Sequence, residues 1–291
     1  LDTIFLAMIE SGFSAKAYSS AKAAGFWQFI PTTGRAFKLQ QNFWLDERRD
    51  FIASTKAASR YLNRLYGQFE NWHLAWAAYN AGEGRIHRAL KKYKETDFWE
   101  LIENHPESLA KETRHYVPKL IAAALVSKNS DQYDFPEVAP LEPLEWDEIK
   151  IKGPIDVKRV AKRLGVNIQT LRELNPALLR DITPPQKSTL FRVPRGSGEN
   201  AQGWVEKLPR EKRFDYIPHR IKRGDTLYGI AKEYGTTMRA IKEFNRITKP
   251  RSLRPGKIVL IPASIPMLKG AANQNKSSKK KAKKAKKRKS K

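Results

Sequence analysis

The sequence of 291 residues contains no cysteine, so neither a disulfide framework nor a thiolate metal site is possible. Histidine, the other common metal ligand, is scarce and scattered. The five histidines show no ligand spacing: they are His73, His87, His105, His115 and His219. The sequence therefore predicts no bound metal, and nothing in it indicates a cofactor.

Long apolar runs are also missing. No stretch approaches the roughly 20 residues that a helix needs to cross a bilayer, so we expect no transmembrane segment. The chain opens at Leu1 without a basic leader region, and we expect any signal peptide or lipid anchor to lie upstream of that residue.

Acidic residues are few relative to basic ones: 30 Asp and Glu stand against 56 Lys and Arg, a net charge of +26. Eleven of the basic residues lie between Lys276 and Lys291, where no acidic residue occurs. We expect residues 264–291 to be disordered, because their Lys, Ala, Ser and Asn cannot form a core. The charge predicts nonspecific attraction to anionic envelope polymers, a lipid surface or nucleic acid. The tail lacks the aromatic residues that stack on bases, which disfavours a dedicated nucleic-acid-binding protein.

Residues 1–130 have the pattern of a compact helical domain. Apolar residues recur at helical spacing from Ile52 to Leu65, and Gly67 is a plausible C-terminal cap. We expect further helices ending near Gly82 and spanning Tyr116 to Val126, the latter with Pro118 in its first turn. Residues 131–147 carry three prolines among acidic residues, which predicts an extended linker.

Beyond this linker the chain repeats itself at an offset of 70 residues. The segment from Val160 to Asn175 matches that from Ile230 to Asn245, and five of sixteen positions are identical. Each copy predicts a strand, two short helices and a strand. We therefore expect two small modules at 148–195 and 218–263, with a linker at 196–217.

Glu10 is the candidate catalytic residue. Apolar residues precede it and Gly12 follows, so it is predicted in the last turn of a helix. The negative end of the helix dipole and apolar neighbours such as Phe26 and Trp27 disfavour its ionised form. A carboxylic acid held protonated near neutral pH can protonate a glycosidic oxygen.

Four ordered motifs carry a resemblance to the soluble-lytic-transglycosylase family of lysozyme-like enzymes. They are Glu10-Ser11, the run from Gly25 to Gly34, Ala78-Tyr79-Asn80-Ala81-Gly82, and Glu112-Thr113 with Tyr116-Val117-Pro118. The two repeats resemble lysin motifs (LysM), although the first is degenerate. The resemblance implies a multidomain fold: an all-α lysozyme-like catalytic domain, two α+β (βααβ) modules and the basic tail.

By this resemblance Glu10 is the single catalytic acid and base, and Ser11 orients the bound sugar. The other implied substrate-binding residues are Gln28, Tyr79, Asn80, Glu112 and Tyr116. In the second module the implied glycan-binding residues are Gly224, Asp225, Thr226 and Leu227, where Asp225 or Thr226 also suits a helix cap.

The implied activity is cleavage of the MurNAc–GlcNAc β-1,4 bond of peptidoglycan glycan strands with formation of 1,6-anhydroMurNAc. Because Asp46, Glu47, Glu83 and Glu112 supply further carboxylates, a muramidase that hydrolyses the same bond stays open. A non-catalytic peptidoglycan-binding scaffold is the other alternative. The expected location is the bacterial cell envelope or periplasm.

Overall fold

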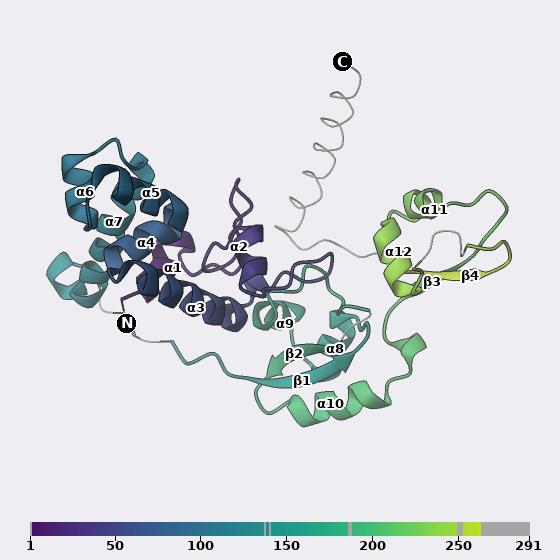
Figure 1. Cartoon of the computed structure of the whole chain (residues 1–291). Helices are drawn as coiled ribbons and strands as arrows, with labels where there is room; N and C mark the ends of the chain where they lie inside the picture. Colours follow the sequence, from purple (N-terminus) through teal and green to yellow (C-terminus); the bar gives the residue numbers. More distant parts are fainter. Residues whose placement is uncertain (1, 137, 140, 186–187, 249–252, 263–291) are drawn as a thin grey trace, which may run out of the picture. The chain divides into compact units, whose positions relative to one another are not determined.

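A computed structural model describes residues 2–136, 138–139, 141–185, 188–248 and 253–262 (Figure 1). The predicted disorder of residues 264–291 lies outside the described residues. The described chain divides into two compact units. The first unit contains residues 2–40 and 47–142, and the second contains residues 41–46 and 143–262.

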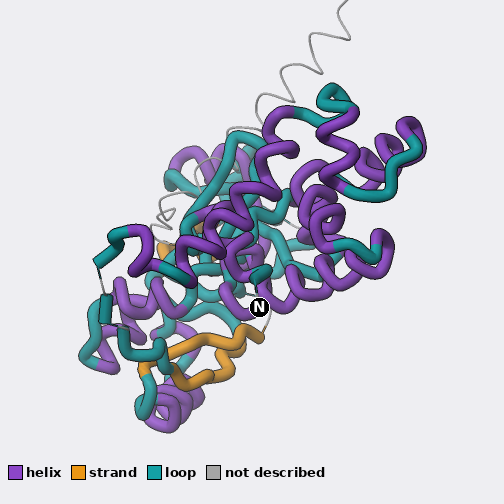
Figure 2. Tube along the Cα trace, turned by 90° about the vertical axis from the view of Figure 1, so that its left-hand side faces the viewer, coloured by secondary structure: helices purple, strands orange, loops and turns teal. Residues whose placement is uncertain are grey.

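The first unit is helical, as the sequence predicts. Its helices are α1 (Ile4–Ser11), α2 (Pro31–Ala36), η1 (Glu47–Arg49), α3 (Phe51–Phe69), α4 (Trp72–Ala81), α5 (Glu83–Tyr93), α6 (Phe98–Asn104), α7 (Lys111–Lys128) and η2 (Ser130–Tyr133). The linker predicted at 131–147 thus begins with a short helical turn. Figure 2 shows this predominance of helix in the described part of the chain, where the four named strands all belong to the second unit.

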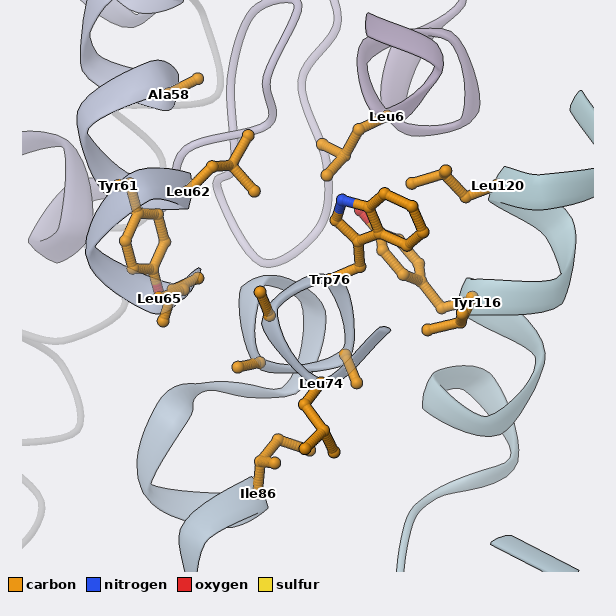
Figure 3. Packing of buried hydrophobic residues seen from close by; sticks show 14 of the residues in the cluster. Leu6, Ala58, Tyr61, Leu62, Leu65, Leu74, Trp76, Ile86, Tyr116 and Leu120 are labelled. Carbon is orange, nitrogen blue, oxygen red and sulfur yellow. The ribbon is translucent and has the colours of Figure 1, made fainter. Parts of the chain in front are cut away.

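Helix α4 lies at the centre of the first unit and packs against α3, α5 and α7. Five consecutive residues of α4, from Leu74 to Ala78, are buried. A helix that is apolar on every face is stable only when other parts of the protein surround it. Figure 3 shows Leu74 and Trp76 of α4 among side chains from these neighbours, including Leu62 and Leu120.

Two helix boundaries differ from the sequence prediction. Helix α3 continues through Gly67 to its last residue, Phe69. Its C-terminal cap is Glu70, whose φ is 49°. Helix α7 begins at Lys111, five residues before Tyr116, so Pro118 lies inside the helix and not in its first turn. Tertiary packing overrides both local signals, since α7 buries Tyr116 and Val117 in the core.

The second unit contains two strand–helix–helix–strand segments. The first consists of β1 (Trp146–Lys152), α8 (Val157–Leu164), α9 (Ile168–Leu174) and β2 (Ser188–Pro194). The second consists of β3 (Tyr216–Arg220), α11 (Leu227–Glu233), α12 (Met238–Phe244) and β4 (Ile258–Pro262). Each forms a two-stranded antiparallel sheet, with Ile149 opposite Phe191 and His219 opposite Val259.

An asparagine closes each of these segments in the same way. The Asn175 side-chain amide donates to the carbonyls of Leu171 and Arg192, at 2.8 and 2.7 Å, and its oxygen accepts the Arg192 N–H at 2.8 Å. Asn245 makes the same three bonds to Ile241 and Leu260, each at 2.7 Å. The repeated asparagine therefore fastens the second helix of each segment to its last strand.

Two features of the second unit do not follow the predicted boundaries. The predicted linker at 196–217 contains helix α10 (Gly198–Lys207), which buries Ala201 and Val205 against β1, and the turn η3 (Arg210–Lys212). Residues 41–46 also group with this unit, because Trp44 packs against Phe244 with ring centroids 5.5 Å apart.

Candidate active site

Glu10 is the penultimate residue of α1, as its sequence context predicts. Gly12 ends the helix with φ 57°, a left-handed conformation that glycine adopts without strain, and its N–H donates to the Met8 carbonyl at 2.8 Å. The Glu10 side chain is half-buried. It therefore lies at the negative end of the helix with part of its solvation removed.

Tyr116 is the hydrogen-bond partner of Glu10. Its hydroxyl donates to Glu10 Oε1 at 2.6 Å, although the two residues are 106 positions apart. The Tyr116 ring is buried on α7, in the same core cluster as Trp76 (Figure 3). A hydroxyl mounted on a buried ring has little freedom, so this bond holds the carboxyl group in one orientation.

Burial raises the pKa of the Glu10 carboxyl above its ordinary value, and the negative charge of Glu112 raises it further. The hydrogen bond from Tyr116 opposes both effects, because it stabilises the carboxylate. Burial and the charge of Glu10 together hold the pKa of Tyr116 well above 10, so the hydroxyl stays a donor. The site is thus an acid with a raised pKa and a fixed proton donor beside it.

Ser11 connects α1 to the following loop. Its hydroxyl lies 2.8 Å from the Phe26 carbonyl and 3.2 Å from the Ala7 carbonyl, and it accepts the Ser14 N–H at 3.2 Å. These contacts occupy the hydroxyl with backbone groups, so Ser11 positions the loop beside Glu10.

Gly25 begins this loop because no other residue fits there. Its φ is +80°, and a Cβ atom would lie 1.8 Å from the Arg48 carbonyl oxygen. Gln28 also has a positive φ, 44°, which is uncommon for a residue with a side chain. The Gln28 amide donates to the Gly25 carbonyl at 2.8 Å, which closes the loop on itself.

Tyr79 and Asn80 lie at the end of α4. The Tyr79 hydroxyl donates to the Trp27 carbonyl at 2.8 Å, and burial followed by the charge of Glu10 raises the pKa of Tyr79 well above 10. The Asn80 side-chain oxygen accepts from the Thr113 hydroxyl at 2.9 Å. Helix α4 is thereby fastened to the loop on one side and to α7 on the other.

The structure thus brings Glu112 and Tyr116 close enough to Glu10 to shift its pKa, and it brings Tyr79 close enough for the charge of Glu10 to raise the pKa of Tyr79. Ser11, Gln28 and Asn80 hold backbone or neighbouring helices. Sequence reasoning did not select Thr113 as a site residue. Its position in the motif Glu112-Thr113 was the available signal, but its bond to Asn80 required the packed helices.

The other carboxylates of the first unit that were considered for a hydrolytic role have different partners. Glu47 accepts from the N–H of Gln40 at 2.7 Å and from its side-chain amide at 3.0 Å. Glu83 forms an ion pair with Arg64. Glu112, which is exposed, is the remaining candidate for a second carboxylate in this unit.

In the second unit, the loop from Gly224 to Leu227 has defined structural roles. The Asp225 carboxylate accepts the Lys222 N–H at 2.7 Å and lies 2.9 Å from His219 Nε2. Thr226, and not Asp225, caps α11 by accepting the Gly229 N–H at 3.0 Å. Leu227 is buried in the core. The backbone of this loop is therefore held in place from both ends.

Three segments of the chain match known families. Residues 3–102 match the Transglycosylase SLT domain, residues 145–208 match the LysM-like domain of the lytic transglycosylase MltD, and residues 219–262 match the LysM domain. Helix α10 falls within the second of these matches.

The chain is 31% identical over 278 residues to the membrane-bound lytic murein transglycosylase D of Escherichia coli strain K12, covering 90% of this chain and 60% of that protein. It is 41% identical over 95 residues to a putative tributyltin chloride resistance protein of Alteromonas sp. strain M-1, covering 32% of this chain and 46% of the relative. The chain thus spans about 60% of the length of the murein transglycosylases it matches.

Two solved structures are also similar. The lytic transglycosylase Slt of Pseudomonas aeruginosa, an inactive mutant, matches 46% of this chain and 22% of its own, with 28% identity and a TM-score of 0.37. The 70 kDa soluble lytic transglycosylase of Escherichia coli matches 42% of this chain and 20% of its own, with 27% identity and a TM-score of 0.36.

Proposed function

We propose that this chain, which combines a Transglycosylase SLT domain with two LysM-type modules, is a lytic transglycosylase of peptidoglycan. It cleaves the bond between MurNAc and GlcNAc and leaves 1,6-anhydroMurNAc at the new end. The observation that carries this proposal is the pairing of Glu10, whose pKa is raised, with the buried Tyr116 hydroxyl.

In this reaction Glu10 first acts as the acid. Its proton passes to the glycosidic oxygen as that bond breaks, and GlcNAc leaves. The hydrogen bond from the Tyr116 hydroxyl, which orients the acid, also stabilises the carboxylate that results. This carboxylate then removes the proton of the C6 hydroxyl of MurNAc, whose oxygen closes the anhydro ring on C1.

One carboxyl group suffices because the nucleophile belongs to the substrate. Hydrolysis by an inverting or retaining route needs a second carboxylate to activate water or to attack the sugar. Intramolecular attack supplies the proximity that such a residue would give. Glu47 and Glu83 engage other side chains, so of these three carboxylates of the first unit Glu112 is the one that supports the muramidase alternative.

The LysM-type modules at 148–195 and 218–263 hold the enzyme on its substrate. Tethering a catalytic domain to a polymer raises the local substrate concentration even when each module binds weakly. In the second module, the fixed backbone of the loop around Gly224 and Asp225 is the surface that would bind the N-acetyl groups of the glycan. Sugar contacts at Ser11, Gln28, Tyr79 and Asn80 belong to the same proposal.

We place the protein in the bacterial cell envelope, where this substrate occurs. None of the helices among the described residues combines the length and apolar character that spanning a membrane requires. The basic residues 276–291 add attraction to anionic envelope polymers.

Mass spectrometry of the soluble products released from peptidoglycan sacculi tests this function. The wild-type protein should release fragments ending in 1,6-anhydroMurNAc, and Glu10→Gln should release none. Reducing-end products would identify a muramidase instead. Sacculus binding without products, or an unchanged rate in Glu10→Gln, would leave a binding scaffold or a different catalytic residue.

Urea denaturation provides the folding control for Glu10→Gln. The pKa of Glu10 is raised in the folded protein. Protonation of Glu10 therefore adds to the free energy of unfolding in full below the ordinary pKa of 4.5, and this contribution is lost as the pH rises through the folded pKa. Glutamine resembles the protonated form at every pH. The variant should therefore be at least as stable as the wild type at pH 7.

A further inference from the structure

A groove in the second unit lies apart from the loop around Gly224. One end is lined by Phe214, Tyr216 and Phe244, and the other by Lys152, Pro154 and Arg213; Arg210 and Arg246 line both ends. These are two adjoining pockets that share Arg210 and Arg246, and together we call them the groove; aromatic rings line its one end and cationic groups its other end. The function proposed above gives this groove no ligand.

The cationic end holds four positive side chains, Lys152, Arg210, Arg213 and Arg246, and its lining contains no carboxylate. At the aromatic end, Glu211 is the acidic lining residue. The side chains of Lys152, Arg210 and Arg246 are exposed, and among the described residues none of them has a carboxylate partner. The positive charge at this end is thus available to an anion from solution.

Arg213 gives the groove a fixed cation. Its guanidinium donates to the carbonyls of Leu208, Lys152 and Val205, at 3.0, 2.8 and 2.9 Å. These neutral acceptors fix the position of the side chain without compensating its charge. A site with one fixed arginine and exposed arginines beside it suits a carboxylate, which arginine binds through two parallel hydrogen bonds.

The rest of the lining indicates which kind of ligand fits the groove: a peptide that carries sugars fits it better than a long polyanion does. Pro154 and Pro185 make part of the lining apolar at the cationic end, and Ile258 does so at the aromatic end, where Tyr216 is half-buried. A nucleic acid or polyphosphate needs positive charge along its whole length. A groove with charge at one end and rings at the other fits a ligand whose own charge is local.

We propose that this groove binds the carboxylate-bearing peptide stems of peptidoglycan, with the stem carboxylates at Arg210, Arg213 and Arg246. This inference rests on the proposed function, because it takes peptidoglycan as the substrate. The stem would thus be held by the modules at a surface different from the loop at Gly224. Affinity for the strand would then depend on the stem as well as on the glycan.

The test measures binding to two soluble ligands that differ only in the stem: GlcNAc-MurNAc-tetrapeptide and GlcNAc-MurNAc. Full-length Glu10→Gln is the background, so that neither ligand is consumed, and Kd is measured by calorimetry. In this background, Arg210→Gln with Arg246→Gln should weaken binding of the tetrapeptide ligand about tenfold or more, by loss of charge-assisted hydrogen bonds. Binding of the disaccharide should stay unchanged.

The matched control is Lys162→Gln with Lys232→Gln. These exposed lysines occupy equivalent positions on α8 and α11 outside the groove, and their replacement removes the same charge. The control should bind both ligands as the background does. Equal weakening by both pairs would mean a general charge effect, and equal affinity of the background for the two ligands would mean that the stem is not bound. Either result overturns the proposal.

The outcomes also separate this inference from the proposed function. If the wild type releases anhydro products while the stem adds no affinity, the groove proposal fails and the enzyme stands. If no products appear but the groove variants lose the stem preference, the groove stands on a protein that binds and does not cleave. Circular dichroism of the variants confirms that each is folded.

Discussion

The hydrogen bond between Tyr116 and Glu10 should set the pH range of the proposed transglycosylase activity. Tyr116→Phe removes the hydroxyl and keeps the ring that packs on α7. The bond is 2.6 Å long and stabilises the carboxylate, so its loss raises the pKa of Glu10 further. Because the proposed reaction starts from protonated Glu10, the alkaline limb of kcat/KM against pH should move to higher pH.

The size of the shift follows from the strength of the bond. A hydrogen bond to a charged group contributes about 1.5–3 kcal/mol. Glu10 is half-buried, and water can replace part of the interaction, so the lower end applies. Since 1.36 kcal/mol corresponds to one unit, the limb should move up by about one pH unit.

The assay is the rate of release of anhydro products from sacculi between pH 4 and pH 9 at constant ionic strength. Tyr79→Phe is the control, because its hydroxyl donates to the Trp27 carbonyl and not to Glu10. An alkaline limb that stays in place or moves to lower pH in Tyr116→Phe would refute this reasoning. So would an equal shift in Tyr79→Phe.

Three further predictions concern stability. Gly25→Ala should destabilise the first unit by more than about 3 kcal/mol in urea denaturation, since its Cβ would lie 1.8 Å from the Arg48 carbonyl oxygen at a φ of +80°; an unchanged midpoint would contradict the close approach. Asn245→Ala removes three hydrogen bonds and should lower local stability by about 2–3 kcal/mol, seen as faster hydrogen exchange at the Leu260 amide. Hydrogen bonds from the Lys222 N–H and from His219 lower the pKa of Asp225 in the folded protein. The Asp225 carboxylate therefore stabilises the folded state above pH 3.8, and this stabilisation is lost as the pH falls through the folded pKa. Asp225→Asn should abolish this acid dependence in measurements of thermal unfolding.

Local sequence patterns predicted helices and strands correctly where the residues that determine the structure lie close together in the chain. Both repeats have the predicted order of strand, helix, helix and strand, and Gly12 and Gly82 end α1 and α4 as their positions indicate. The helix boundaries at Gly67 and Pro118 were wrong because packing of α3 and α7 against the core outweighs the local preference of one residue.

The sequence by itself determined that Glu10 lies at the end of a helix among apolar residues, and this position already disfavours its charge. It also determined the two copies of the strand–helix–helix–strand pattern. Both follow from residues close together in the chain, where spacing alone places side chains on a face or at a cap.

Only the tertiary structure decided which groups meet. Tyr116 reaches Glu10 from 106 residues away, Gly25 must admit the Arg48 carbonyl, and Trp44 packs with the second unit. The groove at Arg210 and Arg246 likewise draws its charge from separate elements. Such contacts depend on how helices and sheets pack, because hydrophobic burial selects the arrangement of the whole and no short sequence pattern encodes which distant residues it brings together.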